Sequence, residues 1–304
     1  MKEINWSPKL SNWIIRHSVL SDVNYIEQLK GATSSKLFLI TDNNKKKAVI
    51  RFYTNHDWNN REPDLAKHEA FSLQTAEESC INTPSLFAYT YNNDITQYPA
   101  VLMSYLPGEI ILPKNDKSQW LKELANLLAD FHRTASHKPF PWSYYPYNKI
   151  DSITIPSWSR HTNEFKETLE LVKSYTPHFN SGFIHRDFHP VNVMWENGKA
   201  TGIVDWPNAC YGPKEVDIGH CRLNLALLYG VDEAALFLNY YKESSQIEIP
   251  DQSYWDFITL LDSLPDPGVY EPWVDFGIGG LTDDLIKERW DTYFTTIHKE
   301  ILRS

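Results

Sequence analysis

The segment that most constrains this chain runs from residue 185 to residue 192 and reads HRDFHPVN. After a short predicted strand, the sequence continues with IVDW at residues 203–206. The spacing H-R-D-x-x-x-x-N, followed by an aspartate at the next strand, is typical of a phosphotransferase catalytic loop and its metal-binding carboxylate. The pattern therefore predicts that Asp187 accepts the proton of an attacking hydroxyl group. It also predicts that Asn192 and Asp205 hold the Mg²⁺ ions that neutralise the nucleotide phosphates.

The chemistry of these three side chains fits those roles. An aspartate has an ordinary pKa of about 3.9, so Asp187 is expected to be ionised at neutral pH and to orient a hydroxyl group. Phosphoryl transfer passes through a loose transition state, so such a base mainly positions the nucleophile. Asn192 offers a neutral oxygen and Asp205 an anionic one, both hard ligands suited to Mg²⁺. The alternative is a structural aspartate that caps a loop, with Asn192 and Asp205 as ordinary turn residues.

The same segments resemble the aminoglycoside phosphotransferase and choline kinase superfamily, whose members are small-molecule kinases with a protein-kinase-like fold. The resemblance rests on His189-Pro190, Asp205-Trp206, the LADFH segment at residues 128–132, and Gly212-Pro213 followed by Asp217. It covers about residues 20 to 230 and is strongest in the catalytic half. One departure is Arg186, where the family usually has glycine and protein kinases have arginine.

The resemblance also implies supporting roles and an acceptor of small size. His185 is implied to be structural, and Asp217 to steady the catalytic loop by accepting hydrogen bonds from its backbone. A protein kinase needs a long activation segment that ends in A-P-E after its metal-binding aspartate. Here Asp217 lies only twelve positions after Asp205, and no A-P-E follows. We therefore expect a small hydroxylated acceptor rather than a peptide.

The order of the predicted elements indicates an α+β fold with two lobes, a small antiparallel sheet followed by a larger, mainly helical part. Apolar and β-branched segments bounded by turn residues predict strands at Tyr25–Lys30, Leu37–Thr41, Ala48–Tyr53, Pro84–Tyr91 and Pro99–Tyr105. A helix is expected from Glu62-Pro63 to about Ser79. The break at Leu106-Pro107-Gly108 predicts a hinge between an N-terminal nucleotide-binding lobe, residues 1–105, and a C-terminal catalytic and acceptor-binding lobe, residues 106–304.

Beyond the hinge, the apolar residues recur with helical spacing. One helix face combines Trp120, Leu121, Leu124, Leu127, Leu128 and Phe131. Further helices are expected at Thr162–Tyr175 and near residues 215–229, 232–244, 251–262 and 282–302. The segment 137–158, rich in proline and aromatic residues, is expected to be irregular.

The nucleotide-binding residues are predicted largely from their positions in this order. Gly31, Ser34 and Ser35 lie between two strands, where a loop that covers the phosphates is expected. Arg51 stands on the third strand in place of the lysine of protein kinases, and Glu69 on the following helix is its expected partner. The residues expected to receive the adenine through their backbone are Met103 and Tyr105.

The overall charge and the cysteines narrow the class of protein. The net charge of −10 argues against a nucleic-acid partner. The LysLysLys run at residues 45–47 reads as a solvated hairpin turn. No apolar run approaches the roughly 20 residues that span a bilayer, and the N-terminus lacks the apolar stretch of a signal peptide. Three widely spaced cysteines suggest neither a zinc site nor disulfides, so a cytoplasmic protein is expected. Its oligomeric state is left open.

The acceptor is the least constrained part of the prediction. Residues 251–291 contain ten acids opposed by only Lys287 and Arg289. On segments expected to be loops, Asp262, Asp266, Glu271 and Asp275 lie among aromatic residues, which favours a cationic, polyhydroxylated, aminoglycoside-like acceptor. The alternatives are a solvated acidic surface, a macrolide or other antibiotic kinase, a kinase for amino-alcohol metabolites, a non-catalytic nucleotide-binding regulator, and hydrolysis as a side activity. ATP is the expected phosphate donor, with GTP also possible.

Overall fold

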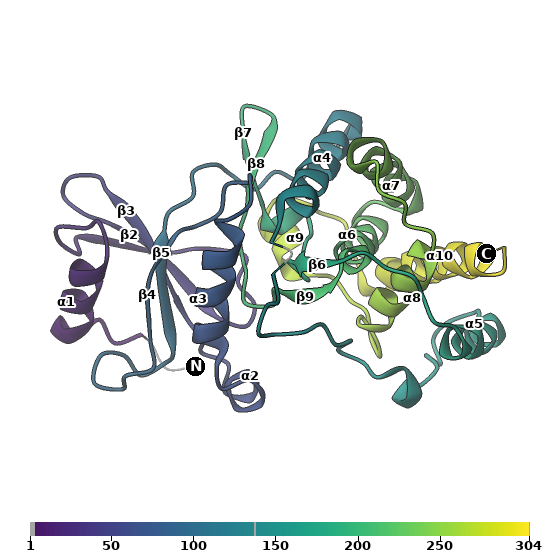
Figure 1. The fold of residues 1–304 in the computed structure, drawn as a ribbon, viewed down its shortest axis with the longest axis horizontal. Helices are drawn as coiled ribbons and strands as arrows, with labels where there is room; N and C mark the ends of the chain where they lie inside the picture. Colours follow the sequence, from purple (N-terminus) through teal and green to yellow (C-terminus); the bar gives the residue numbers. More distant parts are fainter. Residues whose placement is uncertain (1–3, 137, 304) are drawn as a thin grey trace.

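The computed structural model describes residues 4–136 and 138–303 and has an α+β architecture (Figure 1). A five-stranded antiparallel sheet forms the N-terminal part, and helices dominate the C-terminal part. The predicted fold class is therefore confirmed. Residues 1–3, which begin the segment expected to lack a signal peptide, lie outside the described residues, as do residues 137 and 304. Within the described residues, no helix is both long enough and apolar enough to cross a bilayer.

The strands of the sheet follow the order β1-β2-β3-β5-β4. They are β1 (Tyr25–Gln28), β2 (Lys36–Thr41), β3 (Lys47–Phe52), β4 (Leu86–Thr90) and β5 (Ala100–Ser104). Each lies within two residues of its predicted range. The turn between β2 and β3 is closed by Asp42, whose backbone N–H donates to the Lys46 carbonyl and whose carboxylate accepts from the Lys46 N–H. The basic run is thus a solvated hairpin turn, as predicted.

The alternation of side chains in the sheet determines where Arg51 points. Successive residues of a strand face opposite sides of the sheet. Ile50 on β3 packs with Leu10 and Ile14 of helix α1 (Pro8–His17) on one side, whereas Val49 belongs to the core shared with the helical part. Arg51 lies two residues after Val49 and therefore shares its side, toward the helical part of the chain.

The helices of the N-terminal part differ from the prediction in two respects. Helix α1 was not predicted, although Ser7 caps it by accepting from the Leu10 N–H. The helix expected from Pro63 consists of two helices, α2 (His56–Arg61) and α3 (Leu65–Ala76). Glu62 ends α2, so Pro63 lies between the two helices instead of opening one.

The helices of the C-terminal part agree with the sequence pattern, apart from one short addition. They are α4 (Ser118–Thr134), α5 (Thr162–Ser174), α6 (Lys214–Leu228), α7 (Val231–Ser245), α8 (Gln252–Leu261), α9 (Glu271–Asp275) and α10 (Asp283–Ile301). The six residues predicted to form one face of α4 are all buried. Segment 138–158 is irregular apart from a single 3-10 turn, η1 (Ile150–Ser152). Helix α9 corrects the expectation that Glu271 and Asp275 lie on a loop, because they form its two ends.

Two short antiparallel strand pairs frame the segment that carries the predicted motif. Strand β6 (Ser181–Ile184) pairs with β9 (Cys210–Pro213), and β7 (Val193–Glu196) pairs with β8 (Lys199–Ile203). The predicted catalytic loop runs from the end of β6 through the turn η2 (Pro190–Asn192) into β7, and Asp205 follows β8. The motif therefore lies between β6 and β7, and Asp205 lies between β8 and β9.

The connection after β5 is held against β7. The backbone groups of Glu109 and Trp195 exchange hydrogen bonds of 3.0 and 2.8 Å. Gly108 has a φ of 115°, and a Cβ at this position would lie 2.9 Å from the Trp195 carbonyl oxygen. Only glycine fits this close approach without strain. The boundary between lobes 1–105 and 106–304 stays a proposal.

Candidate active site

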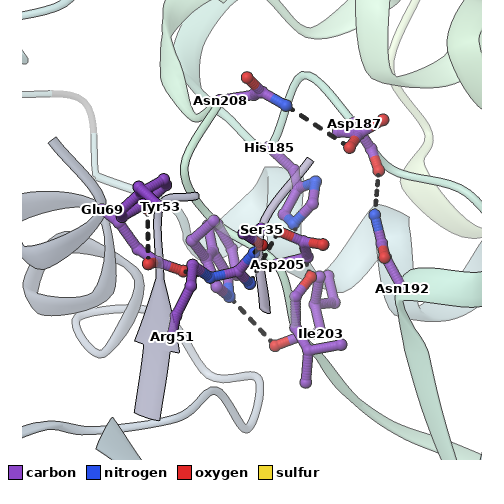
Figure 2. A network of polar contacts seen from close by, with 12 residues as sticks. Ser35, Arg51, Tyr53, Glu69, His185, Asp187, Asn192, Ile203, Asp205 and Asn208 are labelled. Atoms are coloured by element: carbon purple, nitrogen blue, oxygen red, sulfur yellow. Dashed lines mark hydrogen bonds and ion pairs between the residues drawn. The ribbon is translucent and has the colours of Figure 1, made fainter. Parts of the chain in front are cut away.

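Arg51 links the sheet to the segment that carries the predicted metal-binding carboxylate (Figure 2). Its Nε lies 3.0 Å from Glu69 Oε1, and its Nη2 lies 2.9 Å from Asp205 Oδ1. The third guanidinium nitrogen, Nη1, donates to the Ser35 hydroxyl at 2.9 Å. Three predicted site residues thus meet at one side chain. The planar fork of arginine suits these several simultaneous contacts better than the single ammonium of lysine.

The ion pair between Arg51 and Glu69 is buried, so each charge is stabilised by protein groups instead of water. The side chains of Arg51 and Glu69 are 3% and 1% exposed. Burial raises the pKa of Glu69, although Arg51 acts in the opposite direction. The Tyr53 hydroxyl donates to Glu69 Oε2 at 2.7 Å and occupies its second oxygen. Helix α3 is therefore coupled to strand β3 through a charge that has no access to water.

Asp217 holds the backbone of the predicted catalytic loop. Its Oδ2 accepts from the His185 N–H at 2.9 Å, and its Oδ1 accepts from the Arg186 N–H at 2.5 Å. His132 on α4 lies 3.1 Å from Oδ2 and fixes the carboxylate from the other side. The His185 ring contacts the Val204 carbonyl at 3.0 Å, so it joins the loop to the segment before Asp205. These contacts are consistent with the supporting roles that the resemblance implied for His185 and Asp217, and those roles stay a prediction.

Asp187 is surrounded by nitrogen-bearing side chains. Its Oδ1 lies 3.0 Å from His220 Nε2 and 3.8 Å from His189 Nε2, and its Oδ2 lies 3.5 Å from Asn208 Nδ2. Burial alone would raise the pKa of Asp187, but the hydrogen bond to His220 and the nearby His189 hold it well below its usual range. Asp187 is therefore an ionised carboxylate at neutral pH. It remains 28% exposed, so a small molecule can reach it.

The oxygens available for a divalent metal ion come from Asn192 and Asp205. The Asn192 amide donates through Nδ2 to the Asp187 backbone carbonyl at 2.9 Å, which leaves its Oδ1 free to bind a cation. Asp205 contacts Arg51 through Oδ1, and its φ of 71° is in the left-handed region. Asp187, His189 and His220 also place three ligand atoms within 4.8 Å of one another. Imidazoles suit zinc or nickel, whereas Mg²⁺ prefers oxygen, so Asn192 and Asp205 fit Mg²⁺ better.

The glycine loop expected to cover the phosphates lies close to the catalytic loop. Gly31 has a φ of 90°, and a Cβ there would lie 3.2 Å from the Phe276 ring and 3.8 Å from Val191. The loop thus approaches both the catalytic segment and the end of α9. Ser34 is half-buried in this loop, whereas the Ser35 hydroxyl is already engaged by Arg51.

The predicted adenine-binding segment is partly core. Met103 is buried in the core of the molecule, so its side chain is unavailable to a ligand. Tyr105 is half-buried, and Lys47 lies 4.6 Å above its ring. The predicted contact concerns backbone groups at Met103 and Tyr105, and it stays a prediction.

The contacts of the Arg186 side chain explain how arginine is accommodated where the family usually has glycine. Its φ of 66° is in the left-handed region that glycine adopts without strain, so an arginine here needs compensation. Its guanidinium lies 4.4 Å from the Tyr145 ring centroid and 4.0 Å from that of Tyr147, and it donates to the Tyr145 carbonyl. The irregular segment therefore folds over the catalytic loop through Arg186.

The four predicted acceptor-binding acids lie in different environments. Asp262 follows α8, is half-buried, and accepts from the Asn148 N–H at 3.1 Å; burial raises its pKa to about 6. Asp266 is 74% exposed and pairs with Lys287 at 2.6 Å, in agreement with the solvated-surface alternative for this residue. Glu271 and Asp275 are exposed at the ends of α9. Asp262 is the acid that the fold brings near the base, because its charge interacts with His220.

Two residues of the site were not predicted. His220 contacts Asp187 directly, and Asn208 faces the other oxygen of the same carboxylate. His220 lies three positions after Asp217 on a helix that was predicted, so the two share one helix face. That spacing was a usable signal. Asn208 lies in an irregular segment after Asp205 and offered none.

Comparison with protein families and curated proteins gives matches of two kinds. A model of the phosphotransferase enzyme family matches residues 26–256. A homoserine kinase from Rhodopseudomonas palustris strain BisA53 is 31% identical over 91 residues, 28% of either chain. A homoserine kinase from strain BisB5 is 22% identical over 176 residues, 51% of either chain. The matches to these curated relatives thus span about half of their length or less.

Solved structures share the fold over nearly the whole chain. One is a thermostable mutant of aminoglycoside phosphotransferase APH(4)-Ia in a ternary complex with ADP and hygromycin B. It has a TM-score of 0.62, 13% identity, and coverage of 96% of this chain and 98% of that one. Another is a microcompartment-associated aminopropanol kinase, with a TM-score of 0.61, 12% identity, and coverage of 98% and 97%. At these identities the likeness establishes the fold alone.

Proposed function

The chain belongs to the phosphotransferase enzyme family, and on this basis we propose that it transfers the γ-phosphate of ATP or GTP to a hydroxyl group of a small molecule. In this reaction the acceptor oxygen forms a bond to phosphorus while the bond to the nucleoside diphosphate breaks. Asp187 takes the proton of the hydroxyl group. Bound Mg²⁺ at Asn192 and Asp205 would neutralise charge on the phosphates.

The observation that carries the proposal is the position of Arg51 between Glu69 and Asp205. The guanidinium connects the sheet that would hold the nucleotide with the carboxylate that would hold its metal ion. A positive charge beside a metal-binding carboxylate suits polyphosphate, since both the cation and the metal ion attract its oxygens. Asp187 and Asn192 lie on the opposite side of Asp205 in Figure 2. The arrangement supports a donor side and an acceptor side that meet at the transferred phosphate.

For the acceptor we propose a cationic alcohol of the aminoglycoside or amino-alcohol class. Asp187 and Asp262 bring negative charge to the acceptor side, and the net charge of −10 favours a cation at longer range. Hygromycin B is bound in the APH(4)-Ia complex, which supports the aminoglycoside branch. The relatives named for aminopropanol and homoserine support amino alcohols. The role is then either antibiotic resistance or metabolism, depending on which branch is correct.

A nucleotide-consumption screen tests this proposal. The acceptors are amino sugars, macrolides, amino alcohols and homoserine, each with ATP or GTP and with or without Mg²⁺. We expect Mg²⁺-dependent consumption with at least one amine-bearing alcohol. No consumption with any acceptor, together with tight nucleotide binding, would instead favour the non-catalytic regulator.

The state of the cysteines bears on the cytoplasmic location, which is part of this proposal. The three cysteines are free, and Cys210 and Cys221 are buried. Burial raises the pKa of Cys210 to about 12, which keeps its thiol protonated and inert. Free thiols fit the reducing cytoplasm that the sequence led us to expect.

A further inference from the structure

We propose that His220 is a positioning residue for Asp187, which holds one carboxylate oxygen so that the other faces the acceptor hydroxyl. The inference rests on the proposed function, because it gives a role to the side chain that contacts the proposed base. It concerns a residue outside the catalytic-loop motif. His220 lies on α6, 33 positions after Asp187.

One helix face fixes both the backbone and the side chain of the catalytic loop. Residues three positions apart lie on the same face of a helix, about 5–6 Å from each other. Asp217 in the first turn of α6 accepts from the backbone N–H groups of His185 and Arg186. One turn later, His220 Nε2 contacts Asp187 Oδ1 at 3.0 Å. The loop can therefore not shift relative to α6 without loss of both sets of contacts.

The two oxygens of Asp187 are held to different degrees. Oδ1 lies 3.0 Å from His220 and 3.8 Å from His189. Oδ2 makes a weaker contact: it lies 3.5 Å from Asn208 Nδ2, at the limit of a hydrogen bond. A strong contact on one oxygen fixes the rotation of the carboxylate, and the weak contact leaves the other oxygen able to accept. We therefore assign Oδ2 as the atom that receives the acceptor proton.

The titratable and polar groups around His220 come from three elements. Asp187 and His189 face it from the catalytic loop, Asp217 and Asn224 from its own helix, and Asp262 from the end of α8. Burial lowers the pKa of His220, but its contact with Asp187 and the nearby Asp262 and Asp217 outweigh burial and raise it. Burial lowers the pKa of His189 to about 4, so this second imidazole is neutral near pH 7.

Positioning by His220 has a consequence for the pH dependence of turnover. A protonated His220 pairs with Asp187 as an ion pair and makes the carboxylate a weaker base. When His220 loses the proton of Nδ1, the neutral ring can still donate through Nε2. Asp187 then regains its basicity. The maximal rate is therefore expected to rise as the pH passes through the pKa of His220, above its ordinary 6.5.

An NMR titration tests the contact without any acceptor. The His220 ring signal is assigned by its loss in His220→Gln, with a chelator present so that no transition-metal ion binds the imidazoles. The wild type should give a pKa for His220 above 6.5. Asp187→Asn should lower that pKa clearly, because it removes the negative charge. An unchanged pKa in Asp187→Asn overturns the inference.

Kinetics with an acceptor from the screen test the role in turnover. His220→Ala should lower kcat by about 10–100-fold, with the KM of the nucleotide nearly unchanged, because it loosens the base alone. His220→Gln supplies an amide donor at a similar reach, so it should recover most of that loss and abolish the rise of kcat with pH. His161→Gln is the matched control at a half-buried position where the ring pairs with Glu164, and its kinetics should equal those of the wild type.

The outcomes separate this inference from the proposed function. If Asp187→Asn is inactive while His220→Ala keeps the kcat and pH profile of the wild type, only the role of His220 is wrong. If Asp187→Asn is as active as the wild type, the proposed function itself fails. If the His220→Ala protein does not fold, His220→Gln is compared with the wild type instead. The pH profiles of kcat of these two proteins must then differ.

Discussion

Replacement of Arg51 by methionine probes the ion pairs that join the sheet to the catalytic segment. Methionine fills much of the volume but carries no charge. Glu69 then keeps only the hydrogen bond from the Tyr53 hydroxyl and stays buried as an uncompensated carboxylate. Loss of one partner of a buried ion pair typically costs about 3–5 kcal/mol of unfolding free energy. Asp205 also loses a partner, but it is 29% exposed, so water replaces most of that contact. We therefore expect Arg51→Met to cost about 3–5 kcal/mol.

A second substitution separates lost charge pairing from lost packing. Arg51→Met combined with Glu69→Gln leaves no buried charge at this position, and the glutamine oxygen can still accept from Tyr53. The double variant should therefore be more stable than Arg51→Met alone by at least about 2 kcal/mol. Arg133→Met is the control, because this arginine is 59% exposed and pairs with Asp130 at the surface. Its free energy of unfolding should change by no more than about 0.5 kcal/mol.

The differences in unfolding free energy are measured by urea unfolding of the nucleotide-free proteins. Tryptophan fluorescence and circular dichroism monitor the unfolding. Burial raises the pKa of Glu69, and loss of Arg51 raises it further. A pKa raised on folding means that the ionised form destabilises the folded state, so stability is lost as the pH rises through that pKa. The deficit of Arg51→Met should thus be smaller at about pH 5 than at about pH 8. An Arg51→Met protein within about 1 kcal/mol of the wild type, or a double variant no more stable than the single one, would refute this reasoning.

Two further predictions concern the metal ion and the acceptor side. Asp205→Ala should weaken the binding of Mg²⁺-nucleotide, because a charged ligand is lost; calorimetry that finds equal affinity and activity would mean that Asp205 binds no metal ion. Asp262→Asn should gain stability relative to the wild type as the pH rises through about 6, because burial raises the pKa of Asp262 from 3.8 to about 6 and its ionisation destabilises the folded state. That difference of about two pKa units corresponds to an upper value of about 3 kcal/mol, and urea unfolding that shows the same pH dependence for both proteins would contradict it.

Local sequence predicted the parts of the site that depend on local geometry. Asp187 and Asn192 are five positions apart in one loop, so their spacing alone indicated that they act together. Arg51 was predicted from its position on the third strand, where protein kinases carry lysine, and the structure pairs it with Glu69 as predicted. These predictions needed the spacing of the motif and the order of the strands and helices, compared with those of kinases.

Packing between distant segments decided what the sequence could not. Asp262 and Asp266 look alike in the sequence, yet one is half-buried near His220 and the other is exposed beside Lys287. The left-handed conformation of Arg186 could not be predicted from residue type, because its compensation comes from Tyr145 and Tyr147, about forty positions earlier. Burial and compensation of this kind are properties of the folded chain.

Phosphorus NMR of the reaction mixture tests the central claim most directly. Wild-type protein, Mg²⁺, nucleotide and each acceptor of the screen are compared with the Asp187→Asn protein under the same conditions. We predict a new phosphomonoester signal that forms in equal amount to nucleoside diphosphate. In Asp187→Asn this signal should fall by at least about 10²–10⁴-fold, while calorimetry finds nucleotide affinity close to that of the wild type. Nucleoside diphosphate accompanied only by inorganic phosphate, for every acceptor tested, would contradict the claim that this chain phosphorylates a small-molecule alcohol.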